Sequence, residues 1–316
     1  MLISTPPTAR NMKRIAPDYY ESFRCIAGEC RHNCCIGWEI DVDEDTLAYY
    51  QSLKGEIGKR LRENIDFSAD PPHFILAENE RCPFLNENNL CDLILEKGEG
   101  ALCQICDDHP RFYNEFSARV EMGVGLCCEA AGRLIVGRQE KTRLAVLEDG
   151  PEKMDAAEEM LLTMREALFA IVQDRALSIE ERLQSVLAAC GAEMPAAMLA
   201  DWGQFFMQLE QLDPVWQEKL RRLSQPLQAV GSEWDVAFEQ LLHYFLYRHL
   251  PGALQDDCVM ERVAFAVLSV QIIRALCGYI KDLQLGDIVE ISRMYSAEIE
   301  YSDENVDAIL SALTQE

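Results

Sequence analysis

The stretch "RCIAGECRHNCC", residues 24–35, places four cysteines within twelve positions: Cys25, Cys30, Cys34 and Cys35. Six more follow by residue 128, namely Cys82, Cys91, Cys103, Cys106, Cys127 and Cys128. The other three of the 13 cysteines are spread over residues 129–316. A small, loop-rich region with so many thiols is typical of a fold organised by metal. We therefore expect the N-terminal part of the chain to fold around a metal centre.

The composition is that of a globular protein, with 49% hydrophobic and 26% charged residues. The N-terminal stretch "MLISTPPTARNMKR" has no apolar core, so we expect no signal peptide. The longest apolar run, residues 263–280, is interrupted by Gln271 and Arg274, which predicts a buried helix rather than a membrane span. These features predict a cytoplasmic protein with no membrane partner.

The cytoplasm keeps thiols reduced, so 13 cysteines, an odd number, are not expected to form a disulfide framework. Clustered reduced cysteines more often hold a metal. The net charge is −25, from 54 acidic and 29 basic residues, which makes nucleic acid a poor partner. The same charge attracts a cationic partner, such as a lysine-bearing protein or a sulfonium cofactor.

The chain predicts a mostly α fold in two parts. Residues 1–136 form a cysteine-rich, metal-binding region with short helices, and residues 137–316 form an α-helical bundle. In "DEDTLAYYQSLKGEIGKRLREN", residues 43–64, helical spacing aligns Leu47, Tyr50, Ile57 and Leu61. The stretch "HFILAENERCPFLNENNLCDLIL", residues 73–95, predicts a β-hairpin around an Asn-rich turn.

The second part reads as one helix after another. Residues 152–174 have helical spacing, and "SIEE" at 178–181 has the pattern of a capping box that opens the next helix. Pro251 and Gly252 are expected to end a helix over 232–249. Further helices are expected over 195–211, 214–224, 257–283 and 286–298, with a last one after the cap Ser302.

The spacing of the thiols favours an iron–sulfur cluster and leaves zinc open. Thiolates that converge on one site repel one another unless a multivalent cation neutralises them, and either zinc or a cluster takes four. Only one CxxC unit is present, Cys103 to Cys106, and the adjacent Cys34 and Cys35 cannot easily point at one tetrahedral zinc. His32 and His109 are alternative ligands, although a hydrogen-bonding role is expected for each. Cys190, Cys258 and Cys277 are expected to be core residues.

Two cofactor motifs are absent from the sequence. The CxxxCxxC spacing of radical S-adenosylmethionine enzymes does not occur, because Cys35 follows Cys34 directly and position 37 is glycine. A GxGxxG strand-to-helix loop is also missing, which disfavours a Rossmann-like methyltransferase or dehydrogenase.

Four stretches, in order, carry a resemblance: "YYESFRCIAGECRHNCCIGWEIDVD", "RCPFLNENNLCDLI", "CDDHPRF" and "LCCEAAGRL". They resemble the flagellin lysine-N-methylase family, which overlaps a group of cysteine-rich zinc- or iron-chelating proteins. The stretches "YFLYRHLPGAL" and "YSAEIEYSDENVDAIL" are similar to its closing helices.

The resemblance implies an enzyme that transfers methyl from S-adenosylmethionine to lysine ε-amines of flagellin or another lysine-bearing protein. It also implies an iron–sulfur cluster, expected to be of the 4Fe-4S type. The implied metal ligands are Cys25, Cys30, Cys34, Cys35, Cys82, Cys91, Cys106 and Cys127. Cys103 and Cys128 look like local additions.

The sequence identifies neither the catalytic base nor the S-adenosylmethionine pocket. Two other functions remain open at this point: a non-catalytic zinc-binding interaction module, and an iron–sulfur redox sensor.

Overall fold

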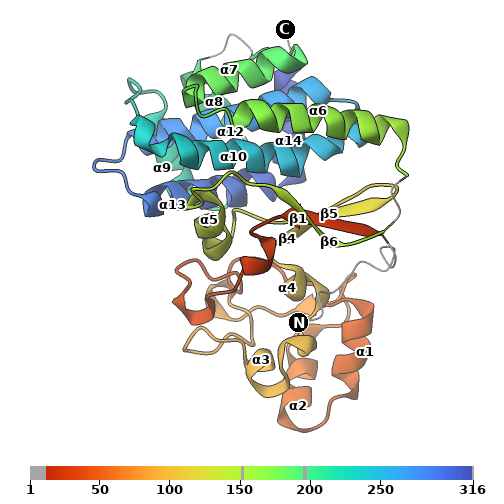
Figure 1. The fold of residues 1–316 in the computed structure, drawn as a ribbon. Helices are drawn as coiled ribbons and strands as arrows, with labels where there is room; N and C mark the ends of the chain where they lie inside the picture. Colours follow the sequence, from red (N-terminus) through yellow and green to blue (C-terminus); the bar gives the residue numbers. More distant parts are fainter. Residues whose placement is uncertain (1–11, 151–152, 195–197, 315–316) are drawn as a thin grey trace. The chain divides into compact units, whose positions relative to one another are not determined.

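The computed structural model describes residues 12–150, 153–194 and 198–314. The chain divides into two compact units (Figure 1). The cysteine-rich unit comprises residues 24–111, and the helical unit comprises residues 12–23 and 112–314, within the described part of the chain. The division therefore falls at residues 111 and 112, whereas the composition had suggested 136 and 137. The physical reason is strand pairing, because the strand over residues 119–124 pairs with one near the N-terminus.

The core of the cysteine-rich unit is built on two short helices, α1 (Glu44–Ser52) and α2 (Gly55–Glu63). Tyr50, Ile57 and Leu61 are buried in it, as their helical spacing predicted. One helix was expected over this stretch, but the chain breaks between the two helices, where Gly55 has a φ of +80°. Asp43 caps α1 by accepting a hydrogen bond from the backbone N–H of Thr46 at 3.0 Å.

The predicted hairpin is present only as a tight turn. The backbone N–H of Asn86 donates to the carbonyl of Leu90 at 2.9 Å, and Leu85 and Cys91 form an isolated bridge. The chain after Cys91 is helix α3 (Asp92–Lys97) rather than a strand. The regular strands of this unit are β2 (Ile65–Asp66) and β3 (His73–Phe74), which pair antiparallel. Helix α4 (Gln104–Asp108) completes the unit.

The helical unit contains a four-stranded sheet in the order β4-β5-β1-β6, which the sequence did not indicate. The strands are β1 (Lys13–Pro17), β4 (Arg111–Glu115), β5 (Arg119–Val124) and β6 (Leu144–Glu148). Strand β1 pairs parallel with β5 and antiparallel with β6, so its residues are central in the sheet. Their short sequence, "KRIAP", does not alternate polar and apolar residues, so a pattern search does not find the strand.

Helices make up most of the helical unit and confirm the expected mostly α class. They are α5 (Glu129–Val136), α6 (Ala156–Val172), α7 (Ile179–Cys190), α8 (Leu199–Phe206), α9 (Pro214–Arg222), α10 (Asp235–His249), α11 (Ala253–Asp256), α12 (Val259–Gly278), α13 (Leu285–Tyr295) and α14 (Asp303–Leu313). The capping box at Ser178 and the cap at Ser302 are both confirmed. The first residues of the helix expected over 195–211 lie outside the described residues.

Helices α10 and α12 form the centre of the helical unit and pack against each other. Almost every side chain from Ala237 to Tyr247 is buried, as are most from Val263 to Cys277. A helix that is apolar on all sides belongs in a core, and the run is confirmed as a buried helix as far as Gly278, where α12 ends. Among the described residues, each helix is too short or too polar to cross a membrane.

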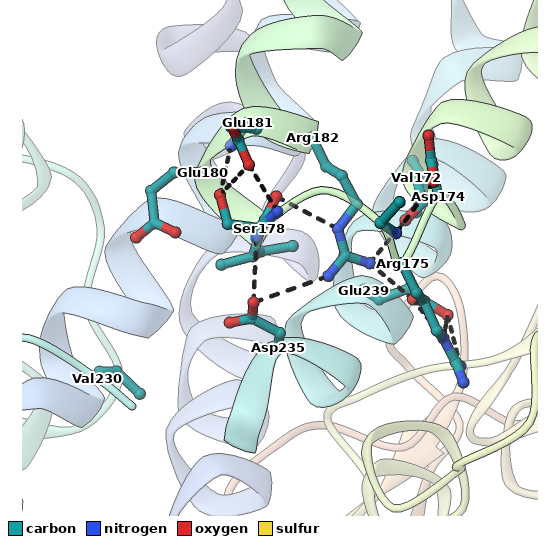
Figure 2. Close-up of polar contacts among 12 residues, drawn as sticks. Val172, Asp174, Arg175, Ser178, Glu180, Glu181, Arg182, Val230, Asp235 and Glu239 are labelled. Atoms are coloured by element: carbon teal, nitrogen blue, oxygen red, sulfur yellow. Dashed lines mark hydrogen bonds and ion pairs between the residues drawn. The ribbon is translucent and has the colours of Figure 1, made fainter. Parts of the chain in front are cut away.

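A buried ionic network joins α7 to α10 (Figure 2). Arg182 is 2% exposed, and its Nη1 donates to Oε2 of Glu239 at 2.7 Å and to the carbonyl of Val172 at 3.1 Å. Arg175 donates to the same carboxylate from the loop that follows α6. Because the charges are paired in the interior, this network orients α7 against α10 and the end of α6.

Candidate metal centre

Five thiols of the cysteine-rich unit converge on one apolar cluster. Cys82 and Cys103 are buried in it, and Cys35, Cys91 and Cys106 are partly buried against it. These five sulfurs are close enough to repel one another when ionised. This repulsion raises the pKa values of Cys35, Cys82, Cys91 and Cys106. We call Cys35, Cys82, Cys91, Cys103 and Cys106 the thiol group.

The backbone explains why residues far apart in the sequence meet here. The N–H of Cys82 donates to the carbonyl of Cys35 at 2.8 Å, which holds the first cysteine run beside the second. Cys91 and Cys103 occupy the N-cap positions of α3 and α4, so both thiols lie where a helix begins. Helix N-termini stabilise negative charge, and a ligating thiolate gains from this position.

Cys103 and Cys106 form a close pair, with their sulfurs 3.4 Å apart. Cys103 is only 1% exposed. The hydrogen bond between the two lowers the pKa of Cys103 and raises that of Cys106, and burial raises the pKa of Cys106 further. Cys103 was not among the metal ligands predicted from the sequence, but it belongs to the thiol group in the structure. The CxxC spacing of Cys103 and Cys106 is the sequence feature that could have predicted this.

Cys34 and Cys35 form a second pair at the edge of the group. A hydrogen bond from Cys35 and the contact with His109 together outweigh burial and lower the pKa of Cys34 to about 4. The same bond is the main reason that the pKa of Cys35 is raised. His109 therefore takes the hydrogen-bonding position expected for it, with its ring 6.1 Å from that of Trp38.

The remaining predicted ligands lie elsewhere. Cys25 is exposed, and its sulfur accepts a hydrogen bond from the backbone N–H of Ala27 at 3.3 Å. The thiol of Cys30 donates to the carbonyl of His32 at 3.2 Å, so both cysteines contact their own loop. Cys127 belongs to the helical unit and precedes α5.

Burial raises the pKa of Cys127 to about 12, although a hydrogen bond with Tyr301 and the charge of Arg248 oppose this. Cys127 thus lies beside a buried polar cluster made of Tyr244, Arg248, His249 and Glu300, which we call the Glu300 cluster.

The Glu300 cluster joins α10 to a π-helix, Ser296–Glu300. Nε2 of His249 lies 2.6 Å from Oε1 of Glu300, and the Tyr244 hydroxyl donates to Oε2 at 3.2 Å. Burial acts to raise the pKa of Glu300, but Arg248 and His249 outweigh it and the pKa is lowered. Single π-turns inside helices recur at functional sites. Sequence reasoning missed this cluster because its members are 56 residues apart along the chain.

One further set of ligand atoms was not anticipated. It consists of a carboxylate oxygen of Glu39, a carboxylate oxygen of Asp41 and a ring nitrogen of His73. Among the described residues, these three atoms all lie within 4.8 Å of one another. The three lie around the bridge between Asp41 and His73. The sulfurs of Cys103 and Cys106 are as close as two sulfurs of a tetrahedral zinc site, which lie about 3.8 Å apart, but within the described residues no three sulfurs of the thiol group lie within 4.8 Å of one another.

The C-terminal part of the chain is similar to a known protein family. Residues 190–316 match the family model of the FliB lysine N-methylase C-terminal domain. This is the helical segment that contains α10, α12 and the Glu300 cluster. The resemblance to the lysine N-methylase family is confirmed in this part of the chain.

Curated relatives show the same similarity. The lysine-N-methylase of Salmonella typhimurium (strain LT2) is 26% identical over 126 residues, which cover 38% of this chain and 31% of that protein. The flagellar biosynthetic protein FliU of Salmonella muenchen is 25% identical over 126 residues, or 75% of its own length. The match therefore spans less than a third of the Salmonella typhimurium methylase. No solved structure matches this chain.

Proposed function

We propose that this protein is an S-adenosylmethionine-dependent lysine N-methyltransferase that acts on flagellin and holds an iron–sulfur cluster in its cysteine-rich unit. The observation that carries the proposal is the match of residues 190–316 to the C-terminal domain of FliB lysine N-methylases. The names of the relatives, lysine-N-methylase and flagellar biosynthetic protein, point to the same reaction and substrate. We assign the protein to the cytoplasm, where thiols stay reduced.

The donor set of the thiol group fits an iron–sulfur cluster. Five cysteines converge where four are needed, and they lie against an apolar cluster that lowers access of water. Their mutual repulsion would be relieved by a multivalent metal centre. Four of Cys35, Cys82, Cys91, Cys103 and Cys106 would hold it.

The reaction transfers a methyl group from sulfur to nitrogen. S-adenosylmethionine supplies the methyl group on a positively charged sulfur. The neutral lysine amine attacks this carbon, the carbon–sulfur bond breaks, and a thioether and a methylated amine remain. The amine must first lose its proton, because an ordinary lysine has a pKa of about 10.4.

This chain favours both cationic reactants through its charge. With a net charge of −25, it attracts the lysine ammonium and the sulfonium of the donor.

The experiment that tests the function is methyl transfer by the full chain. Protein purified without oxygen and loaded with iron and sulfide is incubated with methyl-labelled S-adenosylmethionine and flagellin, and methylated lysines are mapped by mass spectrometry. Label on flagellin lysines supports the proposal. An unlabelled flagellin, with a cluster-loaded enzyme, contradicts it.

Two cysteine variants distinguish the loss of a cluster ligand from a general effect of cysteine replacement on folding. Cys82→Ala removes a buried member of the thiol group, whereas Cys190→Ala changes a half-buried thiol at the end of α7. We expect the first to lose iron, sulfide and methyl transfer, and the second to keep all three. Stoichiometric zinc in a colourless wild-type protein would instead favour the interaction module.

A further inference from the structure

A cavity of about 470 Å³ lies within the helical unit. Strands β1, β5 and β6 line one part of it, and helices α6 and α10 line the rest. Its volume lies within the range of about 300–1,000 Å³ that is usual for small-molecule sites. We call it the α6 cavity.

Two stacked rings line the α6 cavity, and one of them, His243, carries ring nitrogens that can form hydrogen bonds. The ring of His243 stacks on Phe169 with centroids 3.9 Å apart, and His243 is only 3% exposed. Burial, helped by the charges of Arg165 and Arg138, lowers the pKa of His243 to about 3, so the ring is neutral. Within the described part of the chain the ring nitrogens have no hydrogen-bond partner. They offer one donor and one acceptor to a ligand.

Two opposite charges lie at the rim of the α6 cavity. Arg143 precedes β6 and is exposed, and Glu166 is exposed on α6. Neither side chain forms an ion pair with any residue that the structure describes. Arg119 also lines the cavity, but it is already paired with Glu121. The rim of the cavity thus presents a cation and an anion that form no ion pair within the described part of the chain.

Hydrogen bonds hold the lining in place. The hydroxyl of Thr142 donates to Oε1 of Gln240 at 2.7 Å, and Nε2 of Gln173 donates to the carbonyl of Thr142 at 2.8 Å. These bonds tie the segment before β6 to both α6 and α10. A pre-formed lining lowers the entropic cost of binding a ligand.

We propose that the α6 cavity is the binding site for S-adenosylmethionine, an inference that rests on the proposed function and adds the donor site to it. The donor is a zwitterion at its amino-acid end, which matches Arg143 for the carboxylate and Glu166 for the ammonium. Its adenine carries a hydrogen-bonding edge and a flat face, which match His243 and the apolar walls formed by Ile15 and Leu144. His243, Arg143 and Glu166 then each have a partner on the ligand.

The test is equilibrium dialysis of labelled S-adenosylmethionine against the full, cluster-loaded chain. Arg143→Ala removes the rim cation and is expected to weaken binding by about tenfold or more, as for a charged hydrogen bond. Ala170→Trp places a large side chain into the cavity from an exposed position on α6 and is expected to abolish binding. The matched controls Arg221→Ala and Ala167→Trp are exposed, do not line the cavity, and are expected to bind as the wild type does.

The outcomes separate this inference from the proposed function. Wild-type affinity in both Arg143→Ala and Ala170→Trp, with methyl transfer intact, overturns the α6 cavity as the donor site and leaves the function standing. A wild-type protein that neither binds S-adenosylmethionine nor transfers methyl overturns both. Since Arg143 is exposed, its replacement is not expected to unfold the protein, and circular dichroism verifies this.

Discussion

His243 should make the stability of the helical unit depend on pH. Its pKa in the folded protein is about 3, whereas an unperturbed histidine has a pKa of about 6.5. The unfolded chain therefore binds a proton between these two values that the folded chain does not bind. Stability is complete at neutral pH and falls as the pH drops below about 6.5.

The size of the effect follows from the two pKa values. At pH 5 the unfolded histidine is about 97% protonated and the folded one about 1%, which lowers the free energy of unfolding by about 2 kcal/mol relative to pH 7. His243→Gln has no titrating ring, so this loss should disappear. Other groups titrate equally in both proteins and cancel in the comparison.

Urea denaturation at pH 7 and pH 5, followed by circular dichroism, measures the difference. His32→Gln is the matched control because His32 is exposed, and it should lose stability between the two pH values as the wild type does. If His243→Gln loses as much stability as the wild type, then His243 is not held neutral by burial and the reasoning is refuted.

Three other substitutions test the structure. Cys103→Ala should lose bound iron and sulfide because its sulfur lies 3.4 Å from that of Cys106; elemental analysis showing full metal content would remove Cys103 from the ligand set. Glu121→Gln should lower the free energy of unfolding by about 3–5 kcal/mol, because it leaves the buried Arg165 without its bidentate partner; urea titration would show a change below about 1 kcal/mol if the pair were unimportant. Tyr244→Phe should cost about 1–3 kcal/mol, since its hydroxyl contacts the N–H of Leu126 and Glu300, and a smaller loss by the same method would count against the Glu300 cluster as a rigid unit.

Local patterns predicted the helices well because their signals lie within a few residues. The cap at Ser302 and the capping box at Ser178 both act across one turn, and both are present. The buried helix α12 was also predictable, since its apolar residues occur on every side. The break at Gly55 was less visible, because helical spacing continues across it.

Pairings between distant residues were not predictable in the same way. Strand β1 joins β5 more than 100 positions later, through a register such as Lys13 with Arg119. Its short sequence, two basic residues followed by three apolar ones, gives no alternation to detect. The Glu300 cluster and the α6 cavity likewise combine residues from several elements, and no spacing rule links them.

The cysteine-rich part shows most clearly what the sequence determines and what only the tertiary structure decides. The sequence by itself determined that thiols gather in the first 128 residues, that the chain is mostly helical and acidic, and that it resembles lysine N-methylases. Only the tertiary structure decided that Cys103 joins the thiol group, that Cys25 and Cys30 contact their own loop, and that Cys127 lies beside Tyr301. Residue type and local spacing are encoded along the chain, whereas the meeting of distant side chains depends on how buried elements pack together.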